Sequence, residues 1–548
     1  MSSPASTNTV DRDKARKQQT LILVAMCLVL GMAALDDTVV NVALPSLQTN
    51  LAMSVSGLQW IQNAYLLPIA CLVLPAGNLG DIYGRRKVFL AGLGSFIVAS
   101  MLVGIATGSQ MAIAGRLLQG IGAAALLPGS LAILSDAYPD KKERTKAIGI
   151  WSGVSGLALI VGPALGGFLV DTLGWRSIFY LNLPLGMLTV WLTIRVVPLG
   201  KTPRQYQHQP QNSQRLSLPR RLDLPGMLLS VITLASFVVL LMGFDGITAQ
   251  SLFLFCLTCG SAIAFVFVES TSTRPMLPLK LLQQPTFVAV FITNALLLFM
   301  LVSLMFLFSL FLQQVQGYSA AETGLRFLPL NAAFIVASLI SGYLSARIGW
   351  RYAITAGFLL TGCAVLGLTQ VQADTPFNRI LFQLVLVGFG VGFTLSPLTA
   401  AGMGCASSVP GISRPSGSSS TRGAGITAAL MNTSTRLGGA LGIAVQGRLF
   451  SQGMKAHLAK SLAEIGLSQE DRVAILAEAL DHGATRSAQL MSLLPIRNNL
   501  ISLGGLESAI QDAFVSGLSN TLWMGAIALL IAAGLSWTFV RSPSKLPQ

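Results

Sequence analysis

The chain has 548 residues, of which 53% are hydrophobic and only 10% are charged, whereas soluble domains carry roughly 25% charged residues. This composition excludes a soluble globular fold, because a chain of this length cannot bury so much apolar surface. The net charge of +15 resides in short basic clusters between apolar runs. Such clusters are typical of the cytoplasmic loops of membrane proteins and argue against a nucleic-acid partner.

Apolar runs of the length that a bilayer requires recur along the whole chain. A bilayer core of about 30 Å needs roughly 20 apolar residues per helix, and about fourteen runs meet this length. We predict spanning helices at 21-43, 57-80, 88-107, 111-134, 147-171, 176-197, 224-243, 251-268, 286-312, 324-346, 352-370, 378-404, 424-450 and 519-540. An even number of spans places both chain ends on one side of the membrane.

The first apolar run follows a basic segment from Arg12 to Lys17, which is also the pattern of a signal peptide. The run is too long for a signal peptide and contains two aspartates, so we interpret it as a spanning helix. The short loops on the side opposite the termini carry only Arg176, Arg326 and Arg379. The positive-inside rule therefore predicts cytoplasmic termini and a multi-pass protein of the inner membrane.

A sequence repeat divides the chain into two halves. GNLGDIYGRR at 77-86 and GYLSARIGWR at 342-351 both stand where a predicted helix enters a cytoplasmic loop. Repeats in corresponding places indicate duplicated bundles. We predict an all-α polytopic membrane protein with these divisions: a cytoplasmic tail at 1-20, a six-helix bundle at 21-200, a cytoplasmic linker at 201-223, two linking helices at 224-268, a second six-helix bundle at 286-540 that includes a flexible cytoplasmic loop at 405-423 and a long external loop at 451-518, and a cytoplasmic tail at 541-548.

Four motifs stand in the first half of the chain. The first predicted helix ends in LDDTVVNVALP at 35-45, which contains Asp36 and Asp37. The loop after the second helix contains Gly77, Asp81, Gly84, Arg85 and Arg86. The fourth helix contains Arg116, Gln119, Gly120 and Gly122, and the fifth contains Gly162, Pro163, Gly166 and Gly167. Each glycine set is also typical of close helix packing, so the combination carries the specificity.

Together these motifs resemble those of the fourteen-helix, EmrB/QacA-like drug:proton antiporters of the major facilitator superfamily. The resemblance implies two six-helix halves joined by two linking helices, with Asp36 in the family's acidic position, Asp37 in the family's variable position and the 77-86 loop as a gating network. The chain departs from the family in three places. Ile82 stands where a basic residue is frequent, Ala158 replaces a leading glycine, and the arginine expected at position 435 is displaced to Arg436.

Ionisable residues inside a membrane are costly and mark functional sites. Asp36 and Asp37 are the acids that lie well inside an apolar run, and Arg116 and Arg436 are the comparable bases. At 1.5 Å per residue, Asp36 and Arg116 both lie roughly 10 Å from the outer surface, so they are at the right depth to pair. We predict a proton-coupling site at Asp36 and Arg116, with a permanent salt bridge as the structural alternative. Neighbouring helix residues point about 100° apart, and the motif favours Asp36 over Asp37 as the residue that faces the cavity.

Further polar and aromatic residues are weaker candidates for a central substrate cavity, because each is more typical of helix packing. They are Asn41, Gln59, Trp60, Asn63, Tyr65, Asn294, Phe306, Asn331 and Asn432.

We expect no enzyme activity, metal or cofactor, because the histidines fall in predicted loops and no catalytic constellation is present. The predicted function is proton-coupled export of small amphipathic drugs or toxic compounds. The alternative is export of one defined metabolite, pigment or siderophore by the same fold. Lipid and protons are the expected partners, and the sequence leaves open whether a periplasmic adaptor takes part.

Overall fold

The computed structural model describes residues 5–198, 223–242, 248–272, 281, 283–407, 420–464, 472, 475–476 and 503–540. The predicted linker at 201-223, apart from its last residue, and the predicted tail at 541-548 lie outside these residues, as do most of the predicted loops at 405-423 and 451-518.

The first half of the chain forms a bundle of long helices. Its last spanning segment is broken in two by a turn at Leu181, so that α6 and α7 together make one span. The helices are α1 (Ala5–Asn50), α2 (Val55–Tyr83), α3 (Arg85–Gly104), α4 (Ser109–Ala137), α5 (Lys141–Leu173), α6 (Arg176–Tyr180) and α7 (Asn182–Val196).

The second half repeats this plan after a pair of linking helices. The linking pair is α8 (Leu224–Met242) and α9 (Ala249–Thr271). The second bundle contains α11 (Pro285–Leu310), which continues as the wider π-helical turn η2 (Phe311–Val315), then α12 (Ala320–Ile348), α13 (Trp350–Leu368), α14 (Phe377–Ser407), α15 (Ser420–Glu464) and α18 (Leu503–Phe539).

The number of spans agrees with the sequence. Among the described residues, 13 helical segments are long and apolar enough to cross a membrane. The remaining long helix, α15, has a lower mean hydropathy because Arg436 and several small polar residues interrupt its apolar run. With α15 the count reaches the predicted fourteen, and the prediction of an all-α polytopic membrane protein is confirmed.

Most helices exceed their predicted bounds by a few residues, and three extend far beyond them. Helix α1 already begins at Ala5, α15 continues to Glu464, and α18 begins at Leu503. The expected tail at 1-20 and the expected external loop at 451-518 are therefore partly helical. An apolar run marks only the part of a helix that lies in lipid, and polar residues continue the same helix into water.

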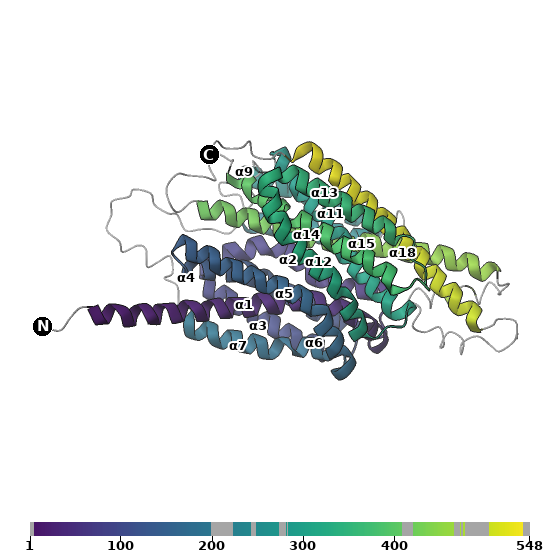
Figure 1. Cartoon of the computed structure of the whole chain (residues 1–548), viewed down its shortest axis with the longest axis horizontal. Helices are drawn as coiled ribbons and strands as arrows, with labels where there is room; N and C mark the ends of the chain where they lie inside the picture. The colour runs from purple at the N-terminus through teal and green to yellow at the C-terminus, as the bar shows by residue number, and fades with distance from the viewer. Residues whose placement is uncertain are drawn as a thin grey trace.

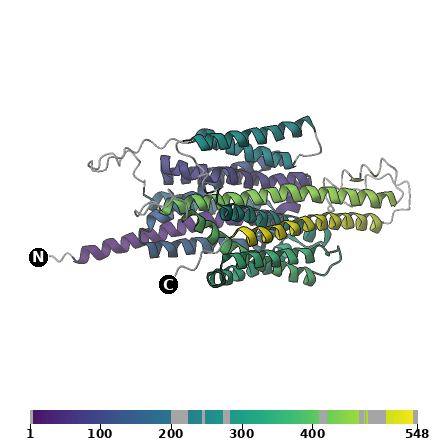
Figure 2. The ribbon, with the colours of Figure 1, turned by 90° about the horizontal axis from the view of Figure 1, so that it is seen from above.

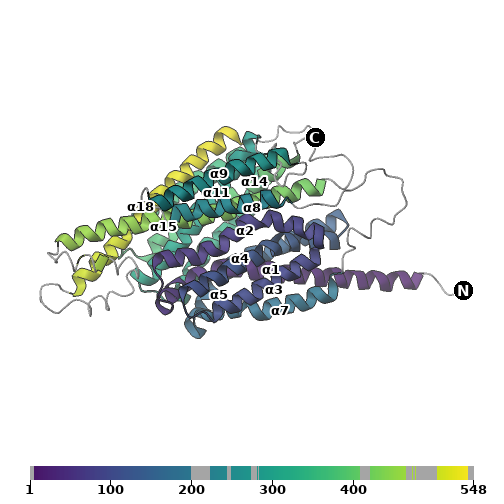
Figure 3. The same cartoon turned by 180° about the vertical axis from the view of Figure 1, so that it is seen from behind.

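The two bundles lie side by side with their helices roughly along one axis (Figure 1). Helix α1 begins and α18 ends at the same end of the molecule (Figures 1 and 3), which we call the terminal end, and the opposite end the far end. At one seam between the bundles α2 contacts α15, with α8 and α9 along its outside (Figure 2). At the other seam α5 contacts α12.

The sequence repeat corresponds to a structural repeat. Gly84 separates α2 from α3 with a φ of 99°, and Gly349 separates α12 from α13 with a φ of 94°. Both glycines donate a backbone hydrogen bond to the carbonyl four residues earlier. The positive φ strains any residue with a Cβ, so each glycine permits the same sharp reversal between two helices.

The seam between α5 and α12 is closed tightly at the far end. A Cβ on Gly167 would lie 2.2 Å from the carbonyl oxygen of Ala320, and one on Gly324 would lie 2.1 Å from that of Pro163. The carboxylate of Asp171 also accepts hydrogen bonds from the first backbone amides of α12, at 3.2 and 2.8 Å. An acid at a helix N-terminus satisfies free N–H groups and complements the helix dipole.

Candidate functional site

A buried ion pair lies inside the first bundle. The guanidinium of Arg116 on α4 contacts the carboxylate of Asp36 on α1 at 2.5 Å, with side-chain exposures of 0% and 1%. Arg116 also donates to the carbonyl of Ile61 on α2 at 3.2 Å. The pair therefore ties α1, α2 and α4 together, and neither charge contacts lipid or water.

Polar side chains from neighbouring helices complete this pair. Asn182 on α7 and Gln119 on α4 donate to Asp36 Oδ1 at 2.9 and 3.2 Å. Gln119 and Asn182 also donate to Ser100 on α3, at 2.6 and 3.3 Å. Both oxygens of Asp36 thus accept hydrogen bonds, which is the condition under which a buried carboxylate is tolerated.

Glycines of α4 bring its side chains this close to the other helices. A Cβ on Gly120 would lie 2.5 Å from the carbonyl oxygen of Tyr65, and one on Gly122 would lie 2.7 Å from that of Gly92. Small residues allow backbones to approach in a membrane bundle. In α5, Gly162 and Gly166 similarly accommodate Thr38 and Val39 of α1.

A central cavity of about 440 Å³ lies between the two bundles. Helices α1, α2, α4, α5, α11, α12, α14 and α15 contribute to its wall, which is mainly apolar, with leucines and Phe327 and Phe334 among the lining residues. The polar and ionisable residues in the wall are Asp37, Thr38, Asn41, Gln62, Tyr65, Trp151, Ser152, Ser155, Asn331, Asn432, Thr435 and Arg436. A mainly apolar cavity with few polar groups is typical of sites for drug-sized ligands.

Tyr65 connects the ion pair with the cavity. Its ring lines the cavity wall, and the guanidinium of Arg116 lies 4.2 Å from the ring centroid. The tyrosine hydroxyl donates to the carbonyl of Ala33 on α1 at 3.5 Å. Asp36 and Arg116 therefore lie directly behind one cavity residue.

The expected orientation of the two aspartates is wrong. Asp36 points into the first bundle, whereas its neighbour Asp37 lines the cavity. There Asp37 forms an ion pair with Arg436 of α15, which joins the two halves of the molecule. The sequence placed Arg436 one position away from the family pattern, and this displaced arginine is the partner of the aspartate in the family's variable position.

The weaker cavity candidates divide into two groups. Asn41, Tyr65, Asn331 and Asn432 line the cavity, whereas Trp60, Asn63, Asn294, Gln59 and Phe306 do not. Asn294, for example, donates to Ser434 and Thr435 of α15 within the second bundle, at 3.2 and 3.0 Å. Sequence reasoning missed Trp151, Ser152, Ser155 and Gln62 as lining residues, because no motif includes them.

The segment expected as a loop at 77-86 is helical except at Gly84, because α2 continues to Tyr83 and α3 begins at Arg85. It forms a charge network at the terminal end. Arg85 contacts Asp81 at 3.1 Å and Asp136 at 2.6 Å, and it donates to the carbonyl of Ala132 at 3.2 Å. Arg86 donates to the carbonyl of Ile194 on α7 at 2.9 Å. Gly77 packs near Pro128 of α4. These contacts tie α2, α3, α4 and α7 together within the first bundle.

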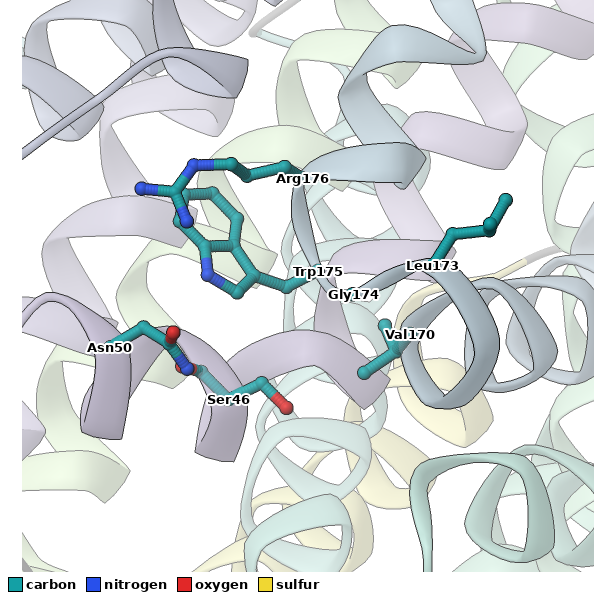
Figure 4. Close-up of a pocket in the computed structure, with 7 residues that line it drawn as sticks. All are labelled: Ser46, Asn50, Val170, Leu173, Gly174, Trp175 and Arg176. Carbon is teal, nitrogen blue, oxygen red and sulfur yellow. The ribbon is translucent and has the colours of Figure 1, made fainter.

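A second hollow, of about 250 Å³, lies at the far end of the first bundle (Figure 4). Its wall includes Trp175 and Arg176, and the guanidinium of Arg176 lies 4.4 Å from the ring centroid of Trp175. None of the deep ionisable residues lines it. In the part of the chain that the structure describes, no group of three His, Cys, Asp or Glu side chains is arranged to hold a metal ion.

Comparisons with known proteins agree with this architecture. A family model described as Major Facilitator Superfamily matches residues 26–443. The chain is 32% identical to the multidrug resistance protein Stp of Mycobacterium tuberculosis, over 95% of this chain and 92% of that protein. It is 28% identical to the tetracenomycin C resistance and export protein of Streptomyces glaucescens, over 97% and 93% of the two chains. The crystal structure of a bacterial homologue of the human lysosomal transporter Spinster, inward-facing and occupied, superposes with a TM-score of 0.65 at 17% identity, covering 95% of this chain and 97% of that one.

Proposed function

Because the chain belongs to the Major Facilitator Superfamily, we propose that it exports small amphipathic drugs across the inner membrane in exchange for protons. The names of its relatives, a multidrug resistance protein and an antibiotic resistance and export protein, support this direction and substrate class. The basic residues at the terminal end support a cytoplasmic location for that end.

The observation that carries the proposal is the ion pair of Asp36 and Arg116 next to the cavity. Both side chains are fully buried, and the guanidinium of Arg116 lies 4.2 Å from the ring centroid of Tyr65, a residue of the cavity wall. A carboxylate inside a membrane bundle whose partners can rearrange is suited to take up and release a proton. Uptake of a proton by Asp36 neutralises its carboxylate and weakens its attraction for Arg116. Protonation therefore changes the contact between α1 and α4.

The contacts between the halves support alternating access. Hydrogen bonds join α1 to the α11–η2 segment towards the far end, from Ser309 to the carbonyl of Asn41 at 2.6 Å and from Gln313 to that of Val42 at 3.0 Å. With the tight α5–α12 contact at Gly167, they close the far end. We infer that this conformation faces the cytoplasm, and that export requires these contacts to separate while the terminal end closes.

The proton gradient supplies sufficient energy for this exchange. A proton that enters through 100 mV gains about 2.3 kcal/mol, and one unit of pH difference adds about 1.4 kcal/mol. The sum of about 3.7 kcal/mol sustains a roughly 500-fold gradient of an uncharged substrate when one proton moves per substrate.

Transport by purified protein in proteoliposomes tests this proposal. A proton gradient across the vesicle membrane should drive substrate in the opposite direction to the protons, against the substrate's concentration gradient. A protonophore should abolish this movement. A panel of structurally unrelated antibiotics and dyes, compared with vesicles that contain no protein, measures the breadth of the substrate range. Substrate movement that does not respond to the protonophore would contradict proton coupling, and transport of one compound alone would contradict multidrug export.

A further inference from the structure

The ion pair of Asp37 and Arg436 combines two departures from the family pattern. Asp37 is in the position that the family leaves variable, and Arg436 is shifted by one residue along α15. The structure brings the two together across the seam between the bundles, in the wall of the central cavity. A second acid and a displaced base therefore form one neutral pair in the wall of the cavity proposed to bind substrate.

In this pair, Arg436 neutralises the negative charge of Asp37, to which an organic cation would otherwise bind. Within the described lining of the cavity, Asp37 is the only acid, and it is bound by Arg436 with side-chain exposures of 22% and 16%. A cationic ligand would have to displace Arg436 and leave an unpaired guanidinium in an apolar wall. Breaking a partly buried pair in this way is unfavourable.

The same wall offers hydrogen-bond donors that no protein atom uses. Arg436 donates to Asp37 through Nη1, while its Nε is buried and has no partner. The indole Nε1 of Trp151, across the cavity on α5, is also buried without a partner. Unsatisfied buried donors are unfavourable, so a ligand that supplies acceptors to them gains affinity.

We propose that Asp37, Arg436 and Trp151 determine the specificity of the cavity for aromatic amphiphiles that carry oxygen acceptors, uncharged or anionic, and that they discriminate against permanent organic cations. This inference rests on the proposed function, because it names the substrate class of the same cavity. Both donor atoms are covered in this conformation, so a small rotation of the Arg436 or Trp151 side chain presents the donor to the acceptor oxygen. The flat apolar body lies against residues such as Phe327 and Phe334, and the ion pair stays intact.

Binding of three matched probes to the full chain in lipid nanodiscs tests the proposal. The probes share one fluorescent naphthalene body and end in a methyl ester, a carboxylate or a trimethylammonium group. We expect the wild-type protein to bind both the ester and the carboxylate at least about tenfold more tightly than the ammonium probe. A smaller preference, or no binding of any of the three, would overturn the inference.

Variants identify the residues responsible. Arg436→Gln leaves Asp37 unpaired and should reverse the preference towards the ammonium probe. Trp151→Phe keeps the aromatic ring but removes the donor, and should weaken ester binding several-fold, by about the value of one hydrogen bond, without affecting the ammonium probe. Arg379→Gln is the matched control, because Arg379 is exposed and outside the cavity. An unchanged preference in Arg436→Gln would contradict the proposal.

Two further measurements remove the remaining ambiguities. If Arg436→Gln does not fold, Arg436→Lys keeps the charge and must retain the wild-type preference, whereas loss of that preference would contradict the role of the pair. Proton-driven transport is measured in parallel in proteoliposomes. Transport without probe selectivity overturns this inference alone, and selective binding without proton-driven transport overturns the proposed function alone.

Discussion

At the residue scale, two adjacent aspartates have different partners. Asp36 is enclosed within the first bundle by Arg116, Gln119 and Asn182, and Asp37 faces the cavity and pairs with Arg436 of the second bundle. A rotation of about 100° between successive helix residues is sufficient to separate them. We infer that the two residues have different roles: Asp36 binds and releases the coupled proton, and Asp37 contributes to substrate recognition.

Replacing Arg116 tests how strongly the first pair depends on both partners. Arg116→Gln leaves Asp36 buried without its cation, and we expect the free energy of unfolding to fall by about 3 kcal/mol or more. Adding Asp36→Asn should recover a large part of this loss, because no unpaired charge then remains. Unfolding in mixed detergent micelles measures both variants, with Arg379→Gln as an exposed control. Additive effects of the two substitutions would show that the residues do not interact.

At the element scale, the contact between α5 and α12 should control opening of the far end. A Cβ on Gly167 would lie 2.2 Å from the carbonyl oxygen of Ala320, and overpacking of this kind costs about 1–3 kcal/mol. Gly167→Ala should therefore shift the population towards the outward-open state by about five- to 150-fold. A cysteine at Ser155 in the cavity should then react faster with a membrane-impermeant reagent added outside.

The matched control for this substitution is on the same helix. A Cβ on Gly149 would meet no atom within 4 Å, so Gly149→Ala should leave the labelling rate of the Ser155 cysteine unchanged. Equal rates in Gly167→Ala and in the parent protein would show that the α5–α12 contact does not determine the position of the equilibrium.

The charge network at the junction of α2 and α3 should affect the rate of transport more than stability. The side chains of Asp81 and Arg85 are 34% and 36% exposed, and exposed ion pairs contribute at most about 1 kcal/mol. We expect Asp81→Asn to slow turnover by up to about fivefold and to leave unfolding almost unchanged. Turnover per molecule in proteoliposomes, with Asp374→Asn as the exposed control, measures this effect. Turnover equal to that of the control would reduce the motif to a topological signal.

The sequence predicted the positions of the helices along the chain better than it predicted which face of each helix lines the cavity. Length and hydropathy placed the spans, and depth along the helix brought Asp36 and Arg116 to the same level. Which of two neighbouring residues faces the cavity depends on how α1 packs against α4, α5 and α7, and these contacts follow no local pattern. The same limitation explains why Asn294, which packs against α15, and Trp151, which lines the cavity, were assigned wrongly or missed.

At the scale of the whole molecule, α1 begins and α18 ends at the terminal end (Figure 3). The positive-inside rule predicts that this end is cytoplasmic. In a background without native cysteines, Lys142→Cys should react only from the cytoplasmic side and Thr107→Cys only from the outside, because both residues are exposed at opposite ends of the first bundle. Labelling of both from one side would contradict the topology, and the reverse pattern would invert it.

The central claim is that Asp36 couples proton movement to export, and the variant Asp36→Asn tests it most directly. The substitution keeps the shape of the side chain and removes its titration. In proteoliposomes, Asp36→Asn should abolish uphill transport driven by a pH gradient but retain exchange of labelled for unlabelled substrate without a gradient. Asp37→Asn should change the affinity for substrate but keep uphill transport dependent on the pH gradient. Uphill, gradient-driven transport by Asp36→Asn at the wild-type rate would contradict the account.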